Sequence, residues 1–140
     1  MRFMMMVMPK GYESAAPDAV PSAEAIEKMM EYNYRLGQAG VLLALDGILP
    51  PSAGARISFA GGKTTVTDGP FAEAKEAIGG YWVIQVHSRE EAIEWARRAP
   101  LSNGEVIEVR RMIEMSDFPE DVQKAVMGFE ARLNPADAKA

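Results

Sequence analysis

The sequence predicts an α+β fold, in which helices cover one face of a mostly antiparallel sheet. Three observations support this prediction: apolar or alternating runs typical of strands, two amphipathic segments with helix-capping residues, and a Gly-Gly pair between two alternating runs, typical of a β-hairpin. In chain order these give strand, helix, strand, hairpin, strand, helix, strand and a final helix. With the hairpin set aside, this is the β-α-β-β-α-β order of the split βαβ, or ferredoxin-like, fold.

The N-terminal part of the chain contains the first strand, the first helix and the second strand. Residues 3–8 are continuously apolar, which indicates a buried strand, and the run is too short for a signal peptide. After a loop rich in Pro, Ala and Ser, Ser22 is the predicted N-cap of an amphipathic helix that ends at Gly40. The apolar residues 41–45 predict a second buried strand, which reaches Asp46.

The middle of the chain contains the hairpin and the third strand of the main sheet. Residues 56–60 and 63–67 alternate polar and apolar side chains around the Gly-Gly pair. Residues 72–78 predict a short helix, which a second Gly-Gly pair is expected to stop. The aromatic and β-branched residues 81–86 indicate a strand inside the sheet.

The second helix and the fourth strand follow. Ser88 and Glu91 form a capping box, so a helix is expected to begin there and to end at Pro100. Residues 105–112 alternate in polarity and predict a strand. The alternation divides its side chains into two sets: Val106 and Val109 toward the core, Glu108 and Arg110 on the other face.

The C-terminal part extends the predicted fold. A second capping box that begins at Asp117 predicts a helix over residues 118–132, and residues 136–140 are expected to be a frayed tail. A length of 140 residues suggests one domain, with residues 1–112 as its core and 113–140 as a helical extension. Helices on one side leave a bare sheet face that must be covered. We therefore expect a homodimer in which two sheets pair as a dimeric α+β barrel.

The composition excludes several classes of chemistry. The net charge of −5 gives no electrostatic attraction to nucleic acid. The chain has no cysteine, and His87 is its single histidine, so thiolate and multi-histidine metal centres are excluded. No carboxylate-rich loop has metal-binding spacing, and we expect neither a metal nor a cofactor. No run approaches the ~20 apolar residues of a membrane helix, so we expect no membrane contact and a cytoplasmic location.

A polar corner follows the hairpin at residues 68–76, where the sequence reads Asp-Gly-Pro-Phe-Ala-Glu-Ala-Lys-Glu. Gly69-Pro70 makes a turn nearly independent of context, because Pro fixes φ and restricts the residue before it. Asp68 precedes this turn, where a short carboxylate can accept backbone N–H bonds. Rigid polar corners at strand ends often carry binding or catalytic groups.

The polar corner also carries a resemblance to a known family. Residues 68–76, with Gly-Gly-Tyr-Trp at 79–82, the helix sequence at 90–96 and Glu-Val-Arg at 108–110, are similar to the YciI-related (YCII) family in its DGPF-domain branch. The match covers most of residues 1–112. The resemblance implies a dimeric α+β barrel of ferredoxin-like protomers.

The resemblance implies less about activity. The DGPF branch is largely uncharacterised, and some members look like partners or appendages of extracytoplasmic-function sigma factors, which implies a sigma factor or another regulatory protein as a partner. Some relatives act on small chlorinated or hydroxylated acids with a His and an Asp as the proposed catalytic pair. That His lies on the first helix, and the corresponding stretch here, near Met29 to Asn33, has no His.

The sequence predicts a ligand pocket beside the polar corner and the inner sheet face. Asp68 is the candidate general base, because a carboxylate beside apolar Phe71 can have a raised pKa; the alternative is that Asp68 caps the Gly-Pro turn. Glu73, Lys75 and Glu76 are expected to be solvated helix charges. The alternative is a charged pocket rim, in which Lys75 pairs with an acid group of the ligand or with Glu108. The predicted pocket residues are Asp46, Gly69, Pro70, Phe71, Glu73, Lys75 and Arg110.

Two functions fit these residues. The first is a small-molecule-binding or regulatory protein without turnover, and we prefer it because no complete catalytic constellation can be assembled. The second is a cofactor-free lyase, isomerase or hydrolase that acts on a small polar or aromatic acid with Asp68 as general base. His87 lies just before a helix cap, where we expect it to be exposed rather than catalytic.

Overall fold

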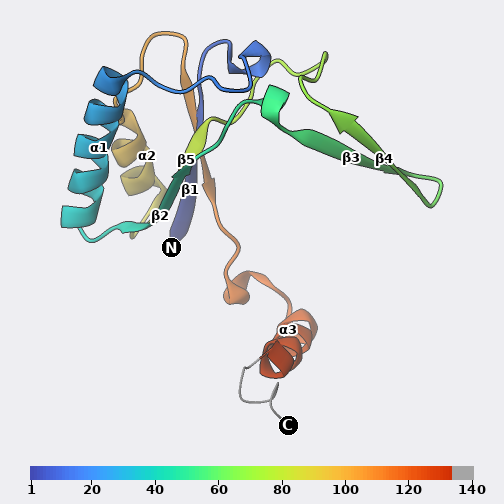
Figure 1. Ribbon diagram of the computed structural model, residues 1–140. Helices are drawn as coiled ribbons and strands as arrows, with labels where there is room; N and C mark the ends of the chain where they lie inside the picture. The colour runs from blue at the N-terminus through green and yellow to red at the C-terminus, as the bar shows by residue number, and fades with distance from the viewer. Residues whose placement is uncertain (134–140) are drawn as a thin grey trace.

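The computed structural model describes residues 1–133 and shows an α+β fold built on a four-stranded sheet (Figure 1). The strands lie in the order β2-β5-β1-β6, and each neighbouring pair is antiparallel. Two helices, α1 and α2, lie together on one face of this sheet (Figure 1). These elements are β1 (Arg2–Met8), α1 (Ala23–Gln38), β2 (Leu42–Gly47), β5 (Gly80–Gln85), α2 (Arg89–Arg97) and β6 (Val106–Arg111). The predicted α+β class is confirmed.

The hydrophobic core lies between the sheet and its two helices. The antiparallel register pairs Met5 of β1 with Trp82 of β5, and alternate residues along each strand point to the same face. The buried core cluster consists of Phe3, Met5, Val7, Tyr32, Leu36, Val41, Trp82, Ile84, Val86, Ala92 and Ala96. The predicted burial of the first strand is therefore confirmed.

Side-chain caps begin both core helices, as predicted. Ser22 Oγ accepts the Ala25 N–H at 3.2 Å, and Ser88 Oγ accepts the Glu91 N–H at 3.1 Å. The carboxylate of Glu91 accepts the backbone N–H of His87 at 2.9 Å. His87 is exposed, as expected of the residue before a cap.

The fourth strand corrects one side-chain assignment. Ile107 and Val109 pack against the core, whereas Val106 is 45% exposed. The reason is the two-residue period of a strand, which places Ile107 with Val109 and Val106 with Glu108 and Arg110. The prediction of Val106 as a core residue was wrong.

The predicted hairpin is confirmed as a separate two-stranded sheet that projects from the body (Figure 1). It consists of β3 (Ala55–Ala60) and β4 (Lys63–Asp68). Gly61 and Gly62 both have positive φ, at 56° and 74°, which is the backbone that a tight two-residue hairpin turn requires. The cross-strand register gathers three exposed apolar side chains on one face: Ile57, Phe59 and Val66.

No helix forms over residues 72–78, where the structure has a turn, a bend and irregular chain instead. Such a short helix is marginal without packing. Gly79 is also held by the sheet, because its N–H donates to the carbonyl of Val7 at 2.7 Å and its carbonyl accepts the Ile48 N–H at 2.9 Å. Neither glycine of this pair has positive φ, so the pair does not act as a turn.

The C-terminal helix α3 (Glu120–Leu133) stands away from the sheet on the far side from α1 and α2 (Figure 1). The predicted helix is confirmed but its predicted cap is not. The Asp117 carboxylate accepts from Arg111 at 2.6 Å and from the Glu114 N–H at 2.7 Å, in the turn before the helix. The expected tail at 136–140 lies outside the described residues. Within residues 1–133, no helix is long and apolar enough to cross a membrane.

Candidate functional site

A cavity of about 530 Å³ lies between α1, the helix-facing side of the sheet and the loop that joins β1 to α1. Its walls are mainly apolar. Its lining residues come from both halves of the fold: Val7, Pro9, Tyr12, Ala19, Val20, Pro21, Ala25, Ile26, Met29, Met30, Asn33, Leu45, Asp46, Gly47, Gly79, Gly80, Tyr81, Trp82, Pro100, Leu101, Ser102 and Glu105. The volume falls in the range of ~300–1,000 Å³ typical of small-molecule sites.

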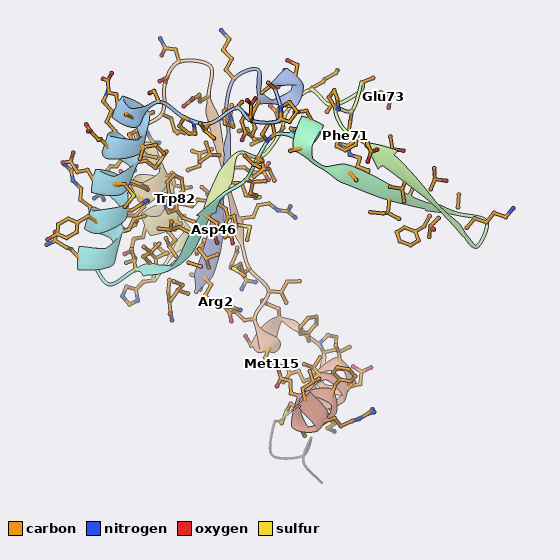
Figure 2. All side chains as sticks on the ribbon, in the orientation of Figure 1. Arg2, Asp46, Phe71, Glu73, Trp82 and Met115 are labelled. Atoms are coloured by element: carbon orange, nitrogen blue, oxygen red, sulfur yellow. The ribbon has the colours of Figure 1, made fainter. Side chains whose placement is uncertain are left out.

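Trp82 is one of the lining residues, although it is only 3% exposed, and two neighbours on α1 fix its position. Its Nε1–H donates to Asn33 Oδ1 at 2.6 Å. The ring of Tyr32 meets the indole edge-on, with centroids 5.1 Å apart. The Tyr32 hydroxyl in turn donates to the Trp95 carbonyl at 2.7 Å, and burial raises the pKa of Tyr32 to about 12. Figure 2 shows Trp82 on the side of the sheet that faces α1.

The loop over the cavity is tied down at both of its sides. The Tyr12 hydroxyl donates to the Ile48 carbonyl at 2.5 Å, and burial raises the pKa of this hydroxyl. Ser52 Oγ donates to the Ala15 carbonyl at 2.6 Å. A Cβ on Gly79 would lie 2.6 Å from Pro9 Cγ, so only glycine lets the loop approach β5 this closely.

Within residues 1–133, no positively charged side chain lines the cavity. Its lining includes two carboxylates, Asp46 and Glu105, and no Lys, Arg or His. Asp46 is paired with Tyr81 across β2 and β5, and it accepts the Tyr81 hydroxyl at 3.3 Å on the face away from Trp82. Glu105 accepts the Ser102 N–H at 2.9 Å. Both carboxylates are therefore hydrogen-bonded by the protein itself.

The polar corner lies at the base of the hairpin, outside this cavity. Asp68 pairs with Ala55 at the end of β4 and is exposed, and within residues 1–133 its carboxylate has no hydrogen bond. Phe71 lies under the Arg56 guanidinium, 3.9 Å from the ring centroid, and Figure 2 shows it at this end of the hairpin. A Cβ on Gly69 would lie 1.7 Å from the Pro51 carbonyl oxygen.

The remaining predicted site residues are dispersed. Glu73 and Lys75 are exposed near the hairpin base (Figure 2 labels Glu73), and Arg110 is exposed on the sheet face away from the helices. In the part of the chain that the structure describes, no ion pair joins Lys75 to Glu108. Of the predicted pocket residues, Asp46 lines the cavity; a ligand contact at any of the others stays a prediction.

Sequence reasoning missed the residues that build the cavity wall. The sequence gives Asn33 no predicted site role, and it indicates Trp82 only as a strand residue that also carries the family resemblance. The one sequence signal for this site is the side-chain amide of Asn33 within an otherwise apolar helix face. A polar group that is removed from water requires a hydrogen-bond partner, and Asn33 therefore points to a polar contact inside the fold.

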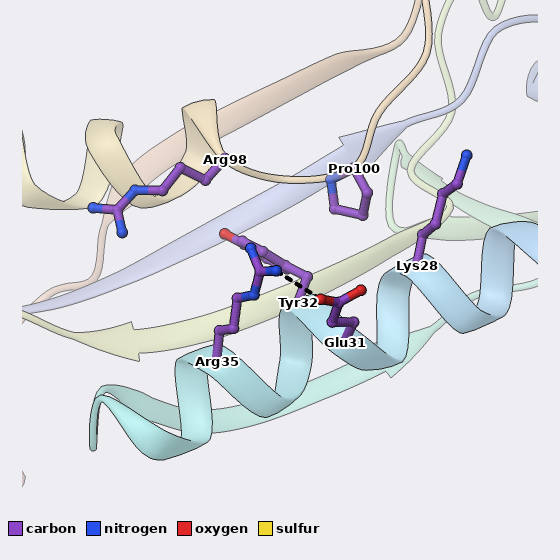
Figure 3. Close-up of a pocket in the computed structure, with 6 residues that line it drawn as sticks. All are labelled: Lys28, Glu31, Tyr32, Arg35, Arg98 and Pro100. Carbon is purple, nitrogen blue, oxygen red and sulfur yellow. Dashed lines mark hydrogen bonds and ion pairs between the residues drawn. The ribbon is translucent and has the colours of Figure 1, made fainter.

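A second hollow, of about 120 Å³, lies where α1 meets the end of α2 (Figure 3). Its lining residues are Lys28, Glu31, Tyr32, Arg35, Arg98 and Pro100. Arg35 pairs with Glu31 at 2.6 Å, and the Arg98 guanidinium stacks 4.4 Å from the Trp95 ring centroid. The small volume and these internal pairings make it a weaker candidate than the larger cavity.

Comparison with known proteins identifies the family. The YCII-related domain matches residues 1–116. An uncharacterized protein of Rhizobium meliloti (strain 1021) is 40% identical over 60 residues, which is 43% of this chain and 48% of the relative. The matched region thus spans about half of that relative's length. Because the family match covers most of its length, the chain belongs to the YCII-related family.

Proposed function

We propose that this protein binds a compact, mainly apolar small molecule in the cavity between α1 and the sheet, without turning it over. The observation that carries the proposal is the cavity itself, about 530 Å³ in volume, whose mainly apolar lining includes an indole that Asn33 and Tyr32 hold in place. Fixed aromatic walls favour binding because little side-chain freedom is lost when a ligand enters.

Catalysis receives less support from the same geometry. The two carboxylates of the lining are already hydrogen-bonded, to Tyr81 and to the Ser102 N–H. Asp68, the base of the alternative enzyme function, is exposed at the hairpin base and does not line the cavity. A general base needs a substrate within hydrogen-bond reach.

A fragment screen by thermal shift and by ¹H–¹⁵N NMR tests the binding function. The indole N–H signal of Trp82 is a suitable readout of binding, because Trp82 lines the cavity. In the Trp95→Phe variant only one indole signal remains, which assigns it to Trp82. Ligands are expected to raise the melting temperature and to move the Trp82 signal. Ala25→Phe, which adds a ring at the cavity lining, is expected to abolish both effects, whereas Ala125→Phe on α3 is the matched control. A screen in which no fragment moves the Trp82 signal contradicts the proposal.

We also propose that the protomer is ferredoxin-like and pairs with a second copy through its open sheet face. The strand order β2-β5-β1-β6 supports the fold. The register places Met4 and Met6 of β1 and Val83 of β5 on the face away from the helices, where Met4 is half-buried and Met6 and Val83 are only 8% and 9% exposed. Arg110 and Glu108 flank this apolar strip with charges of both signs, which suits a self-complementary, two-fold contact.

The hairpin and α3 support this pairing, because both project on the open side of the sheet (Figure 1). An isolated hairpin and an isolated 14-residue helix are each marginal in water. Both carry exposed apolar side chains, with Phe59 80% exposed on the hairpin and Phe129 57% exposed on α3. Sedimentation tests the pairing: a stable monomer at micromolar concentration contradicts it.

We also propose that the chain belongs to the DGPF branch of the family and that its partner is a sigma factor or another regulatory protein. Both proposals rest on the polar-corner sequence at residues 68–76. Co-purification of the full chain tests the partner. Recovery of the protein alone contradicts that part of the proposal.

A further inference from the structure

We propose that the cavity selects an uncharged ligand with an apolar body, such as a fused aromatic ring, and one carbonyl-type acceptor that the Asn33 side chain binds. The inference rests on the proposed function, because it specifies the ligand of the same cavity. It differs from the expectation that the family resemblance gave, which was a small acid.

The side-chain amide of Asn33 has only one orientation that fits its neighbour. The indole N–H of Trp82 can only donate, so the atom 2.6 Å from it must be the amide oxygen. The amide NH₂ therefore points away from the indole. Among the described residues, its acceptor is the thioether sulfur of Met30, at 3.8 Å, which is a weak acceptor. Asn33 and Met30 both line the cavity, so we place this amide donor within reach of a ligand carbonyl.

The charge of the lining argues against an acidic ligand. An ionised carboxylate that leaves water needs a cation or several donors, because burial of an unpaired charge is unfavourable. Among the residues that the structure describes, no Lys, Arg or His lines the cavity. Glu105 adds a negative charge to the lining, whereas the Asp46 carboxylate lies on the face away from Trp82. A neutral carbonyl has no such requirement, since one amide donor satisfies it.

The remaining lining sets the body of the ligand. Ile26, Met29 and Leu45 contribute apolar surface, and Trp82 presents an aromatic wall. Methionine side chains adapt to irregular shapes and contact aromatic rings favourably. These residues fit a flat apolar body better than a sugar or a nucleotide, which would need many more polar partners.

Three ligands of the same ring system test the inference: naphthalene, 2-naphthamide and 2-naphthoate. Each is titrated into the Trp95→Phe protein at pH 7.5, with the Trp82 indole N–H signal as the readout. We expect 2-naphthamide to bind about three- to tenfold more tightly than naphthalene, the gain typical of one neutral hydrogen bond. We expect 2-naphthoate to bind at least tenfold more weakly than the amide.

Two variants test the residues. Asn33→Asp keeps an oxygen for the Trp82 N–H but lacks the NH₂ group, so we expect the affinity ratio of 2-naphthamide to naphthalene to fall to about one. Met30→Lys places an ammonium at a lining position that is 60% exposed and therefore tolerant, and we expect 2-naphthoate affinity to rise at least tenfold.

The outcomes separate the inference from the function on which it rests. Equal binding of 2-naphthoate and 2-naphthamide to the parent protein overturns the selection for uncharged ligands and leaves the binding function intact. An amide advantage that survives Asn33→Asp overturns the role of Asn33. If naphthalene and its two derivatives all leave the Trp82 signal unmoved, and the fragment screen does too, both proposals fail.

Discussion

The hydrogen bond between Trp82 and Asn33 is expected to stabilise the fold measurably as well as to shape the cavity. Asn33→Leu removes the acceptor 2.6 Å from the indole nitrogen of a residue that is only 3% exposed. A buried donor left without a partner costs about 1–3 kcal/mol. At roughly 3 °C per kcal/mol for a domain of this size, the melting temperature is expected to fall by about 3–9 °C.

A double-mutant cycle isolates the bond from the packing change. Urea unfolding of the wild type, Asn33→Leu, Trp82→Phe and the double variant gives the coupling free energy between the two side chains. We expect a coupling of about 1 kcal/mol or more, because Trp82→Phe removes the donor that Asn33→Leu would leave unsatisfied. Asn33→Asp is the control, since it retains an acceptor oxygen. A coupling near zero would refute the role given to this bond.

Three further predictions concern the cavity roof, the hairpin and the junction before α3. Gly79→Ala is expected to lower the free energy of unfolding by about 1–3 kcal/mol, because its Cβ would lie 2.6 Å from a proline ring. Gly128→Ala, whose Cβ would have no atom within 4 Å, should not destabilise the protein, and equal urea midpoints for the two variants would contradict this prediction. Phe59→Asp, on the apolar face of the hairpin, is expected to shift the sedimentation of the protein toward monomer. Thr65→Asp, on the opposite face, is expected to leave the dimer intact, and an unchanged dimer in both variants argues against hairpin contacts between copies. The hydrogen bond from the Arg2 guanidinium lowers the pKa of Glu114 below its usual 4.5, so the stabilisation is present above that pH and is lost as pH falls through the lowered value. The amide-exchange protection factors at residues 113–117, which are corrected for the intrinsic rate at each pH, should therefore fall on acidification, and constant protection factors down to pH 3 would contradict this.

The secondary structure could be predicted where its signal is local. Ser22 and Ser88 cap helices because a hydroxyl accepts an N–H three residues ahead, and the Gly61-Gly62 turn needs only its own backbone. The prediction over residues 72–78 was wrong because the outcome depends on contacts of Gly79 with Val7, far away in the sequence.

The cavity could not be predicted for the same reason. Its lining comes from the β1–α1 loop, one side of α1, the ends of β2 and β5, and the segment after α2. No short motif links these segments. The polar corner at residues 68–76 is a clear sequence signal, but its chemistry says nothing about where tertiary contacts place it. In the structure Gly69 fits against the Pro51 carbonyl, which explains the glycine by steric fit alone.

The contact of Gly69 with the 3-10 turn Pro51–Ala53 connects two distant parts of the molecule. The Gly69 N–H also donates to Gly54 at 2.9 Å, and Ser52 in the same turn donates to Ala15 in the loop over the cavity. The turn Pro51–Ala53 therefore contacts both the base of the hairpin and the loop over the cavity. If contacts of a second copy with the hairpin change the affinity of the cavity for a ligand, thermodynamic reciprocity requires that the ligand change the association of the two copies by the same factor.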